Sequence, residues 1–481
     1  MNVTTISSVT CPVCGSLCDD IELVVENNRV VDVKNACAVG AARFLHYSDH
    51  RNVKPLIRKN GELVEASLDE TIRKSAEILA EAKYPILYGW SSTNCEASRV
   101  GLELAEEVGG VMDNTSTICH GPSILAIQDV GIPTCTLGQL RHRADLVFYW
   151  GCDPWSAHPR HVDRYTSFST GRFQGSTWRR NAKRAAATQT LKKLKRVANL
   201  TMSRKVPELS STESHLPEFM LRKERKMVVV DVRKTRSAEC ADYFIQVKPN
   251  SDYELFQAFR MLARDEEIDV DEVAGVPVDL LEEVADVMIG CNLGVFFFGV
   301  GLTMSSGKHR NIDAAICLTR DLNKRTKFVI MPMRGHFNVT GANTVSTWQT
   351  GYPFAVDFSQ GYPRYNPGET SVVDILCRDE SDAALVIASD PVAHFPQKAV
   401  ENLVKKPLIT IDPEVTPTSL MSDVVIPSAF VGIENSGTAY RMDHVPLPLK
   451  KVVEPPETCH SDQEILRKIL NEVKKIRRPS D

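Results

Sequence analysis

Residues 145–154 read Asp-Leu-Val-Phe-Tyr-Trp-Gly-Cys-Asp-Pro, a short apolar run that ends in a loop of glycine, aspartate and proline. Such a run, bounded by turn residues, is typical of a strand buried on both faces. Six other stretches follow the same plan: residues 85–92, 227–235, 295–301, 328–335, 384–391 and 408–413. Because helical patterns separate them, the sequence predicts doubly wound α/β domains with parallel sheets. Ligands bind beyond the carboxyl ends of such strands, and the number of units favours two α/β layers and a large ligand or two ligands.

The composition is that of a soluble globular protein. The chain has 481 residues, of which 43% are hydrophobic and 25% charged, and this excludes disordered and fibrous classes. No run of about 18 apolar residues is present, so no membrane span is predicted. The first residues do not resemble a signal peptide, and we expect a cytoplasmic protein. A net charge of −4 also argues against a nucleic-acid partner.

One segment departs from the α/β pattern. Residues 172–217 contain 11 basic and two acidic residues, a net charge of +9. The rest of the chain therefore has a net charge of −13, although the whole chain has only −4. The sequence predicts an irregular insertion on the surface, at most partly helical. A solvated surface loop without function, a basic contact to an acidic partner and a sequence artefact all remain open for it.

The 13 cysteines point to redox or metal chemistry in a reducing compartment. Cys11, Cys14, Cys18 and Cys37 form a C-x2-C-x3-C-x18-C pattern. Three thiolates from one loop and a fourth from further along are typical of a [4Fe–4S] cluster, because each iron needs a soft anionic sulfur. A four-thiolate zinc site is the alternative, although such sites usually have two C-x2-C pairs. A third possibility is that the four thiols bind no metal.

Three further stretches carry candidate chemistry. Cys119 and His120 stand side by side in a turn-rich loop, where the thiol is a nucleophile, a ligand to a soft metal or a buried cysteine. Arg334 follows a buried strand and is placed either to bind a carboxylate with its planar fork or to form a surface salt bridge. His158-Pro159-Arg160-His161 predicts a polar loop rather than a metal-binding pair, and Gly299-x-Gly301 by itself is weak evidence for a nucleotide.

Taken in chain order, these motifs resemble the molybdenum/tungsten bis-pterin oxidoreductases of the formate dehydrogenase and dimethyl sulfoxide reductase type. The resemblance covers residues 9–450 apart from the basic segment. Besides the four N-terminal cysteines, it rests on the following motifs: Ile118-Cys119-His120-Gly121; Gly151-Cys152-Asp153-Pro154 with His158-Pro159; Val230-Asp231-Val232-Arg233-Lys234-Thr235; Arg334-Gly335-x-x-Asn338-Val339-x-Gly341-Ala342; Ser389-Asp390-Pro391; and Ser422-Asp423-Val424-Val425-Ile426-Pro427 leading to Glu434-Asn435-Ser436-Gly437-Thr438.

The resemblance implies a site and its cofactors. Cys119 is expected to bind tungsten or molybdenum in a bis(pterin guanine dinucleotide) centre, with His120 managing a proton and Arg334 binding a carboxylate. Cys11, Cys14, Cys18 and Cys37 are expected to bind the [4Fe–4S] cluster. The residues expected to hold the pterin cofactors are Gly151, Asp153, Asp231, Arg233, Gly299, Gly301, Gly335, Asn338, Ser389, Asp390 and Asp412. Val39 stands where related formate dehydrogenases have a lysine after the fourth cluster cysteine.

Within that family the chain looks most like the B subunits of archaeal formylmethanofuran dehydrogenases, which take part in the first step of methanogenesis from CO2. The resemblance implies reversible CO2 reduction to formate, together with an amidohydrolase-type subunit, a small β-barrel pterin-binding subunit and ferredoxin-type subunits. A formate dehydrogenase catalytic subunit is one alternative, and a metal-free scaffold of a formyltransferase/hydrolase-type complex is another.

The same resemblance divides the chain into parts. The domains expected are an iron–sulfur module at 1–54, an α/β pterin-binding domain at 55–114 plus 333–445, a second such domain at 115–332 with the insertion 172–217, and a C-terminal tail with a helix at 446–481. We expect no C-terminal β-barrel within the chain.

Overall fold

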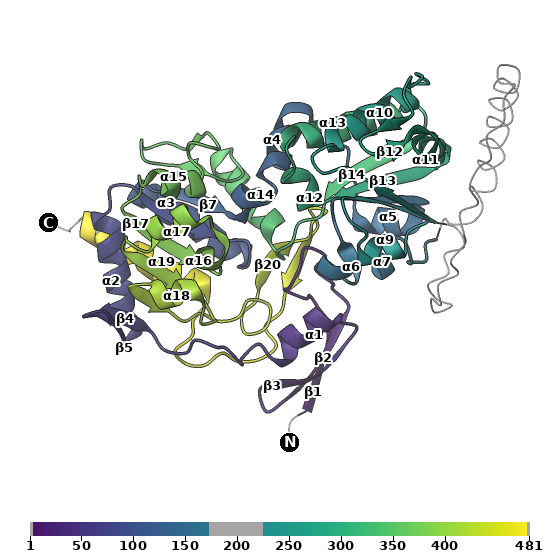
Figure 1. Cartoon of the computed structure of the whole chain (residues 1–481). Coiled ribbons are helices and arrows are strands. Elements are labelled where there is room, and N and C mark those ends of the chain that lie inside the picture. Colours follow the sequence, from purple (N-terminus) through teal and green to yellow (C-terminus); the bar gives the residue numbers. More distant parts are fainter. Residues whose placement is uncertain (1–2, 173–224, 479–481) are drawn as a thin grey trace, which may run out of the picture. The chain divides into compact units, whose positions relative to one another are not determined.

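The computed structural model describes residues 3–172 and 225–478, and Figure 1 shows its elements. The chain forms two compact units, Met1–Gly121 with Arg334–Asp481 and Pro122–Met333. Apart from Arg172, the predicted basic insertion lies outside the described residues. None of the described helices is long and apolar enough to cross a membrane. The predicted division into a module at 1–54 and a tail from 446 stays a prediction.

The unit formed by Pro122–Met333 contains a parallel five-stranded sheet. Its strand order is β10 (Tyr243–Gln246), β9 (Lys226–Asp231), β8 (Leu146–Trp150), β13 (Leu293–Phe298) and β14 (Lys327–Pro332). One face packs on α10 (Asp252–Ala263), α11 (Val278–Gly290) and α13 (His309–Leu322) through strand residues such as Phe148 and Phe296. Alternate residues such as Tyr149 and Phe297 are buried on the opposite face. The sheet is covered on both sides, which confirms the strands predicted from continuous apolar runs.

The other unit, Met1–Gly121 with Arg334–Asp481, contains a nine-stranded sheet. Its parallel centre is β7 (Val111–Asn114), β6 (Pro85–Gly89), β17 (Ala383–Ile387), β18 (Leu408–Ile411) and β19 (Val424–Ile426). Antiparallel strands extend both edges: β15 (Val356–Asp357) with β16 (Arg364–Tyr365), and β4 (Leu56–Lys59) with β5 (Glu62–Glu65).

Helices cover both faces of this nine-stranded sheet as well. Leu385 and Ile387 lie in a core formed with α2 (Leu68–Glu81), α3 (Cys95–Val108), α14 (Val339–Thr350) and α19 (Asp462–Arg477). Ala384 and Val386 point into a second core formed with α15 (Val372–Arg378) and α17 (Gln397–Leu403). This alternation along one strand is the doubly wound arrangement that the sequence predicted.

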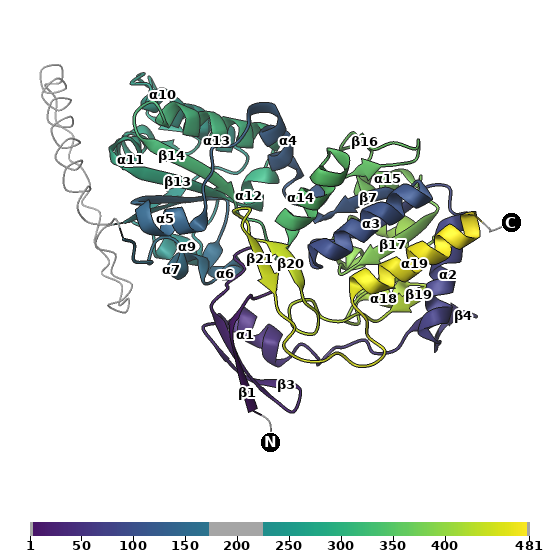
Figure 2. The ribbon, with the colours of Figure 1, turned by 180° about the vertical axis from the view of Figure 1, so that it is seen from behind.

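Smaller elements complete the two units, and Figure 2 shows them from behind. An antiparallel sheet of β1 (Val3–Val9), β2 (Ile21–Glu26) and β3 (Arg29–Lys34) precedes α1 (Ala38–Leu45), and β20 (Gly437–Tyr440) pairs with β21 (Pro446–Leu449). The remaining elements are η1 (Thr115–Ile118), α4 (Gly121–Val130), α5 (Leu137–Arg143), α6 (Pro154–Ala157), α7 (His161–Arg164), α9 (Arg236–Glu239), β11 (Glu272–Val273), β12 (Val276–Pro277), α12 (Val300–Thr303), α16 (Pro391–His394) and α18 (Pro417–Met421).

The strand order of each sheet reverses at one point. In the five-stranded sheet the chain runs outward from β8 to β10 on one side and from β13 to β14 on the other, so the reversal lies between β8 and β13. In the nine-stranded sheet it lies between β6 and β17. Ligands of open α/β sheets bind at such switch points, beyond the carboxyl ends of the strands.

Aspartates at the opposite, amino ends hold neighbouring strands in register. The Asp145 carboxylate accepts hydrogen bonds from the Asn292 backbone N–H at 2.9 Å and the Leu293 N–H at 3.1 Å. Asp382 accepts from the N–H groups of Lys83 at 2.7 Å and Tyr84 at 2.9 Å. Each carboxylate satisfies donors that the ladder leaves open where a strand begins.

We predict that Asp145→Ala destabilises the unit that contains it by about 3 kcal/mol, because buried N–H donors lose a charged acceptor. For a unit of this size the melting temperature should fall by roughly 6–10 °C. Differential scanning calorimetry of the variant measures this shift. The exposed Glu267→Ala change serves as the control, and equal melting temperatures for the two variants would contradict the assignment.

Candidate active site and cluster loop

At the switch point of the five-stranded sheet, glycines allow the backbones of two loops to come into contact. A Cβ placed on Gly301 would lie 2.7 Å from the Gly151 carbonyl oxygen, and one on Gly299 would lie 2.5 Å from the Cys152 Cβ. Gly151 itself has a φ of +58°, which favours glycine. The two loops after β8 and β13 therefore touch, and side chains are excluded at the points of contact. Such a glycine-lined edge lets a pyrophosphate approach the backbone, which fits the predicted pterin dinucleotide.

The predicted carboxylates at this edge also support the loops. Asp153 accepts hydrogen bonds from the Ser237 backbone N–H at 3.2 Å and from the Ser156 hydroxyl at 2.7 Å. Asp231 ends β9, accepts from the Arg233 N–H at 3.2 Å and has its pKa raised by burial. Arg233 is exposed. Asp153 thus already has two hydrogen-bond partners that shape the loop, while Asp231 and Arg233 remain accessible from solvent.

Aspartates also accept hydrogen bonds in the loops at the carboxyl ends of β17 and β18 in the nine-stranded sheet. Asp390, next to Ser389 in the loop after β17, accepts hydrogen bonds from the Thr418 backbone N–H at 3.0 Å and its hydroxyl at 2.5 Å. Asp412 follows β18 and accepts from the Glu414 N–H at 2.8 Å. Burial raises the pKa of Asp412 to about 8, so this carboxyl takes up a proton near neutral pH. All of the predicted cofactor-binding residues in both units remain predictions as ligands.

The four N-terminal cysteines lie in one neighbourhood. Cys11 and Cys18 are buried, Cys14 and Cys37 are half-buried, and all four are free thiols. The Cys11 N–H donates to the Cys18 carbonyl at 2.9 Å. Burial raises the pKa of Cys11 well above its ordinary value, and the other three thiols, when ionised, raise it further. Bare thiolates are therefore costly here, and bound metal ions would offset that cost.

The surroundings of the sulfur atoms fit a cluster. A Cβ on Gly40 would lie 3.2 Å from the Cys11 Sγ and 3.6 Å from the Cys37 Sγ, so the absence of a side chain leaves room beside both sulfurs. Cys37 caps α1, its sulfur accepting the Gly40 N–H at 3.4 Å. In residues 3–172 and 225–478, no three His, Cys, Asp or Glu side chains converge as ligands of one ion. A cube differs from such a site because each thiolate binds a separate iron.

The cysteine loop is hydrogen-bonded to the loop that carries Arg334. The Gly15 N–H donates to the Gly335 carbonyl at 3.0 Å, and Cys14 forms an antiparallel bridge with His336. A Cβ on Gly15 would lie 2.3 Å from the Arg334 carbonyl oxygen, so only glycine fits at this position. The residue after one predicted cluster ligand thus touches the backbone of the predicted carboxylate-binding arginine.

Arg334 is buried, Cys119 is half-buried, and the two influence each other electrostatically. Arg334 is 4% exposed, so the surface salt bridge considered from the sequence is wrong. Burial lowers the pKa of Arg334 to about 10, and an ionised Cys119 nearby opposes that effect. Burial raises the pKa of Cys119 to about 11, which Arg334 partly offsets. A thiol of that pKa is protonated at neutral pH in the absence of a metal, which disfavours a free nucleophile.

The Cys119 loop is held by an amide network. Asn114, at the end of β7, accepts from the Ser116 N–H at 2.9 Å and donates to the Asn343 side chain at 2.9 Å. Ser116 also donates to Asn343 at 3.1 Å, which joins this loop to α14, the helix after Arg334. His120 is fully buried beside Cys119. The structure thus brings Cys119, His120 and Arg334 into the same unit as the four cluster cysteines.

Gly335 and Asn338 differ in their surroundings. A Cβ on Gly335 meets no heavy atom within 4 Å, so its place next to Arg334 is open. The buried Asn338 side chain donates to the Thr93 carbonyl at 2.7 Å and accepts from the Tyr440 N–H at 2.9 Å. Asn338 therefore joins the loop after β6 to β20.

Sequence reasoning missed His444 and did not predict the burial of two other histidines. Partial desolvation and the nearby Arg334 lower the pKa of His444, whose side chain is exposed. The signal was Tyr440-Arg441-Met442-Asp443-His444, shortly after the last of the family motifs.

The polar loop predicted for residues 158–161 is confirmed for His158, Pro159 and Arg160, which form a turn between α6 and α7, whereas His161 begins α7. Both imidazoles are buried. Tyr149 on β8 and Phe297 on β13 pack against the His161 ring, contacts that local sequence does not reveal.

Comparisons with known proteins identify the family of the chain. Residues 51–472 match the family model "Molybdopterin oxidoreductase". Two similar proteins are B subunits of tungsten-containing formylmethanofuran dehydrogenase 2. The one from Methanocaldococcus jannaschii is 46% identical over 98% of this chain and 100% of its own length. The one from Methanococcus maripaludis is 45% identical over 98% of this chain and 99% of its own length.

A solved structure shows a similar fold. It is the formyltransferase/hydrolase complex FhcABCD from Methylorubrum extorquens in complex with methylofuran, with a TM-score of 0.64 and 19% identity over 87% of this chain and 98% of the matched one. At that identity the likeness concerns the fold alone. From the family model and the two close relatives, the chain belongs to the molybdopterin oxidoreductase family and, within it, to the group formed by the B subunits of formylmethanofuran dehydrogenases.

Proposed function

We propose that this chain is the catalytic subunit of a cytoplasmic archaeal formylmethanofuran dehydrogenase that reduces CO2 reversibly to formate. The observation that carries the proposal is the half-buried Cys119 thiol near the buried Arg334, whose loop is hydrogen-bonded to the loop that carries Cys14. Cys119 would bind the tungsten or molybdenum of a bis(pterin guanine dinucleotide) centre. Cys11, Cys14, Cys18 and Cys37 would bind a [4Fe–4S] cluster.

The bound metal centre would supply the two-electron redox chemistry. Arg334 would bind the carboxylate that develops as CO2 is reduced, because a buried guanidinium offers two parallel N–H donors to its oxygens. His120, fully buried next to Cys119, would hold or release the proton that accompanies the reaction. Arg334 and His120 are buried and Cys119 is half-buried, and the low dielectric of such surroundings would strengthen these charge interactions.

The cluster would deliver electrons one at a time. Cys14 forms a bridge with His336, and the Gly15 N–H donates to the Gly335 carbonyl. An electron route from the cluster to the Arg334 loop would therefore cross hydrogen-bonded backbone. Val39 is 51% exposed at the start of α1 and offers no charge where related formate dehydrogenases have a lysine. The electron path in this chain would therefore not use a lysine at that position.

Other subunits would complete the reaction. The close relatives are named as B subunits of their enzymes, and FhcABCD is a multi-subunit assembly. A ferredoxin-type subunit would supply electrons, and a small β-barrel subunit would complete the enclosure of the pterins. Formate would pass to an amidohydrolase-type subunit for condensation onto methanofuran.

We expect Cys119→Ala to abolish CO2 reduction in the assembled complex and to lower tungsten or molybdenum content, because the metal loses its protein ligand. Arg334→Lys should retain the metal but lower kcat/KM by about a hundredfold, since a point charge cannot bind both oxygens. Metal analysis and steady-state assays measure both effects. Cys377→Ala, a half-buried thiol on α15, is the matched control. Full activity of Cys119→Ala with metal bound would refute the assignment.

We predict that Cys14→Ala removes one cube of iron and acid-labile sulfide from each copy of the chain in the complex, because one iron loses its thiolate. Chemical analysis of the purified complex against the wild type quantifies the loss. Cys317→Ala, a half-buried thiol of the other unit, should leave both contents unchanged. An unaltered iron content in Cys14→Ala would instead favour zinc or no metal at the four cysteines.

A further inference from the structure

Asp113 is a buried carboxylate that the reaction scheme does not use. It lies near the carboxyl end of β7, six residues before Cys119, and is 1% exposed. One of its oxygens accepts the backbone N–H groups of Asn114 at 2.8 Å and Ala355 at 3.1 Å. The other accepts the Val372 N–H at 2.9 Å. Three backbone donors from separate segments thus meet at one side chain.

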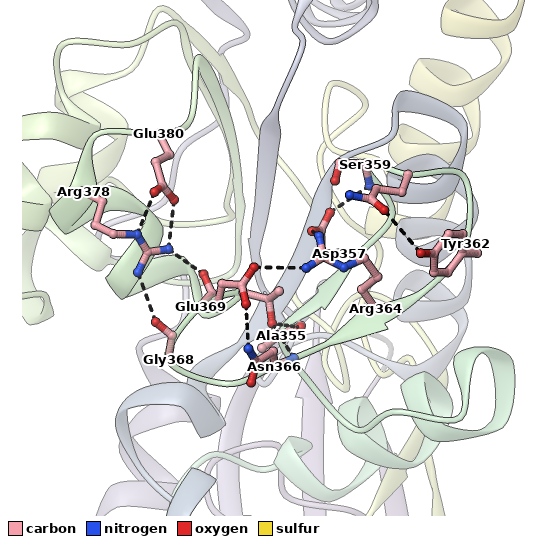
Figure 3. A network of polar contacts seen from close by, with 12 residues as sticks. Ala355, Asp357, Ser359, Tyr362, Arg364, Asn366, Gly368, Glu369, Arg378 and Glu380 are labelled. Carbon is pink, nitrogen blue, oxygen red and sulfur yellow. Dashed lines mark hydrogen bonds and ion pairs between the residues drawn. The ribbon is translucent and has the colours of Figure 1, made fainter.

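Two of those donors come from the ends of a loop that is internally braced. Figure 3 shows the contacts, in which Arg364 binds Asp357 at 3.2 Å and Glu369 at 3.0 Å, and Asn366 donates to Glu369 at 2.6 Å. Within the same loop the Thr370 hydroxyl donates to the Ala355 carbonyl at 2.7 Å. The donors that face Asp113 are therefore held in position independently of Asp113 itself.

The remaining contacts of Asp113 lead toward Cys119. Asn114, bonded to it through its N–H, accepts the Ser116 N–H that begins η1. The Thr117 side chain, two residues before Cys119, also hydrogen-bonds to Asp113. One carboxylate thus joins the braced loop to the turn that ends at the thiol.

We propose that Asp113 is the positioning residue that sets the direction of the Cys119 thiolate at its metal. The inference rests on the proposed function, because it assigns a purpose to the loop that presents the metal ligand. Asp113 touches neither substrate nor metal in this role and acts through Asn114 and Thr117. A neutral amide cannot replace it, since an asparagine has one accepting oxygen and would turn a donor toward one of the three N–H groups.

The test is Asp113→Asn in the full complex. We expect the metal to remain bound, the electron paramagnetic resonance signal of the one-electron-reduced metal to shift, and kcat to fall by about a hundredfold. The KM for CO2 should change little, because Arg334 is untouched. The matched control is Asp382→Asn, which removes a carboxylate that also accepts two backbone N–H groups but lies at the amino end of the same sheet. It should leave the signal and kcat as in the wild type.

Two results separate this inference from the proposed function. An unchanged signal and kcat in Asp113→Asn, with the signal altered in Cys119→Ala, would overturn the positioning role and leave the metal site intact. An unchanged signal in Cys119→Ala would overturn the proposed function itself. If Asp113→Asn fails to assemble, Thr117→Val decides the question, because a shifted signal supports the role and an unshifted one refutes it.

Discussion

The contact between Gly15 and the backbone of Arg334 and Gly335 is the constraint on which the candidate site depends. A side chain at position 15 would collide with the Arg334 carbonyl oxygen, and the N–H of Gly15 donates to the next carbonyl. The cysteine loop and the arginine loop therefore form one body of hydrogen-bonded backbone. The same loop accepts the Met442 N–H through the Gly15 carbonyl, which adds the turn carrying His444. Three segments far apart in the sequence meet there.

Burial shifts the pKa values of ionisable groups at the candidate site. Low dielectric raises the pKa values of Cys11, Cys119 and Asp412 and lowers that of Arg334. Holding such groups in their charged form costs free energy unless a partner of opposite charge is present. A metal centre would be that partner for the thiolates, and an anionic substrate would be that partner for Arg334. Burial raises the pKa of Asp113 as well, to about 7, although three backbone N–H groups donate to it. These contacts to three separate backbone segments are what suit Asp113 to positioning.

Much of the fold could be predicted because parallel strands buried on both faces leave a local signal. Residues 146–150 and 383–387 are continuous apolar runs, and each forms a central strand. The edge strands β15 and β16 left no comparable signal, since each has only two residues. In the site, Cys119 and Arg334 could be singled out by motif. The burial of His158 and His161 could not be predicted, because contacts such as that of Phe297 with His161 join residues far apart in the sequence.

The sequence by itself determined the alternation of strands and helices, the cysteine spacing and the family, because these depend on local residue order and periodicity. Tertiary structure alone decided that Arg334 is buried near Cys119, that Gly15 meets Gly335, and that Asp113 receives N–H groups from Ala355 and Val372. Those contacts join residues more than 200 positions apart. Local propensity carries no information about such pairs, because only the packing of the whole unit brings their backbones together.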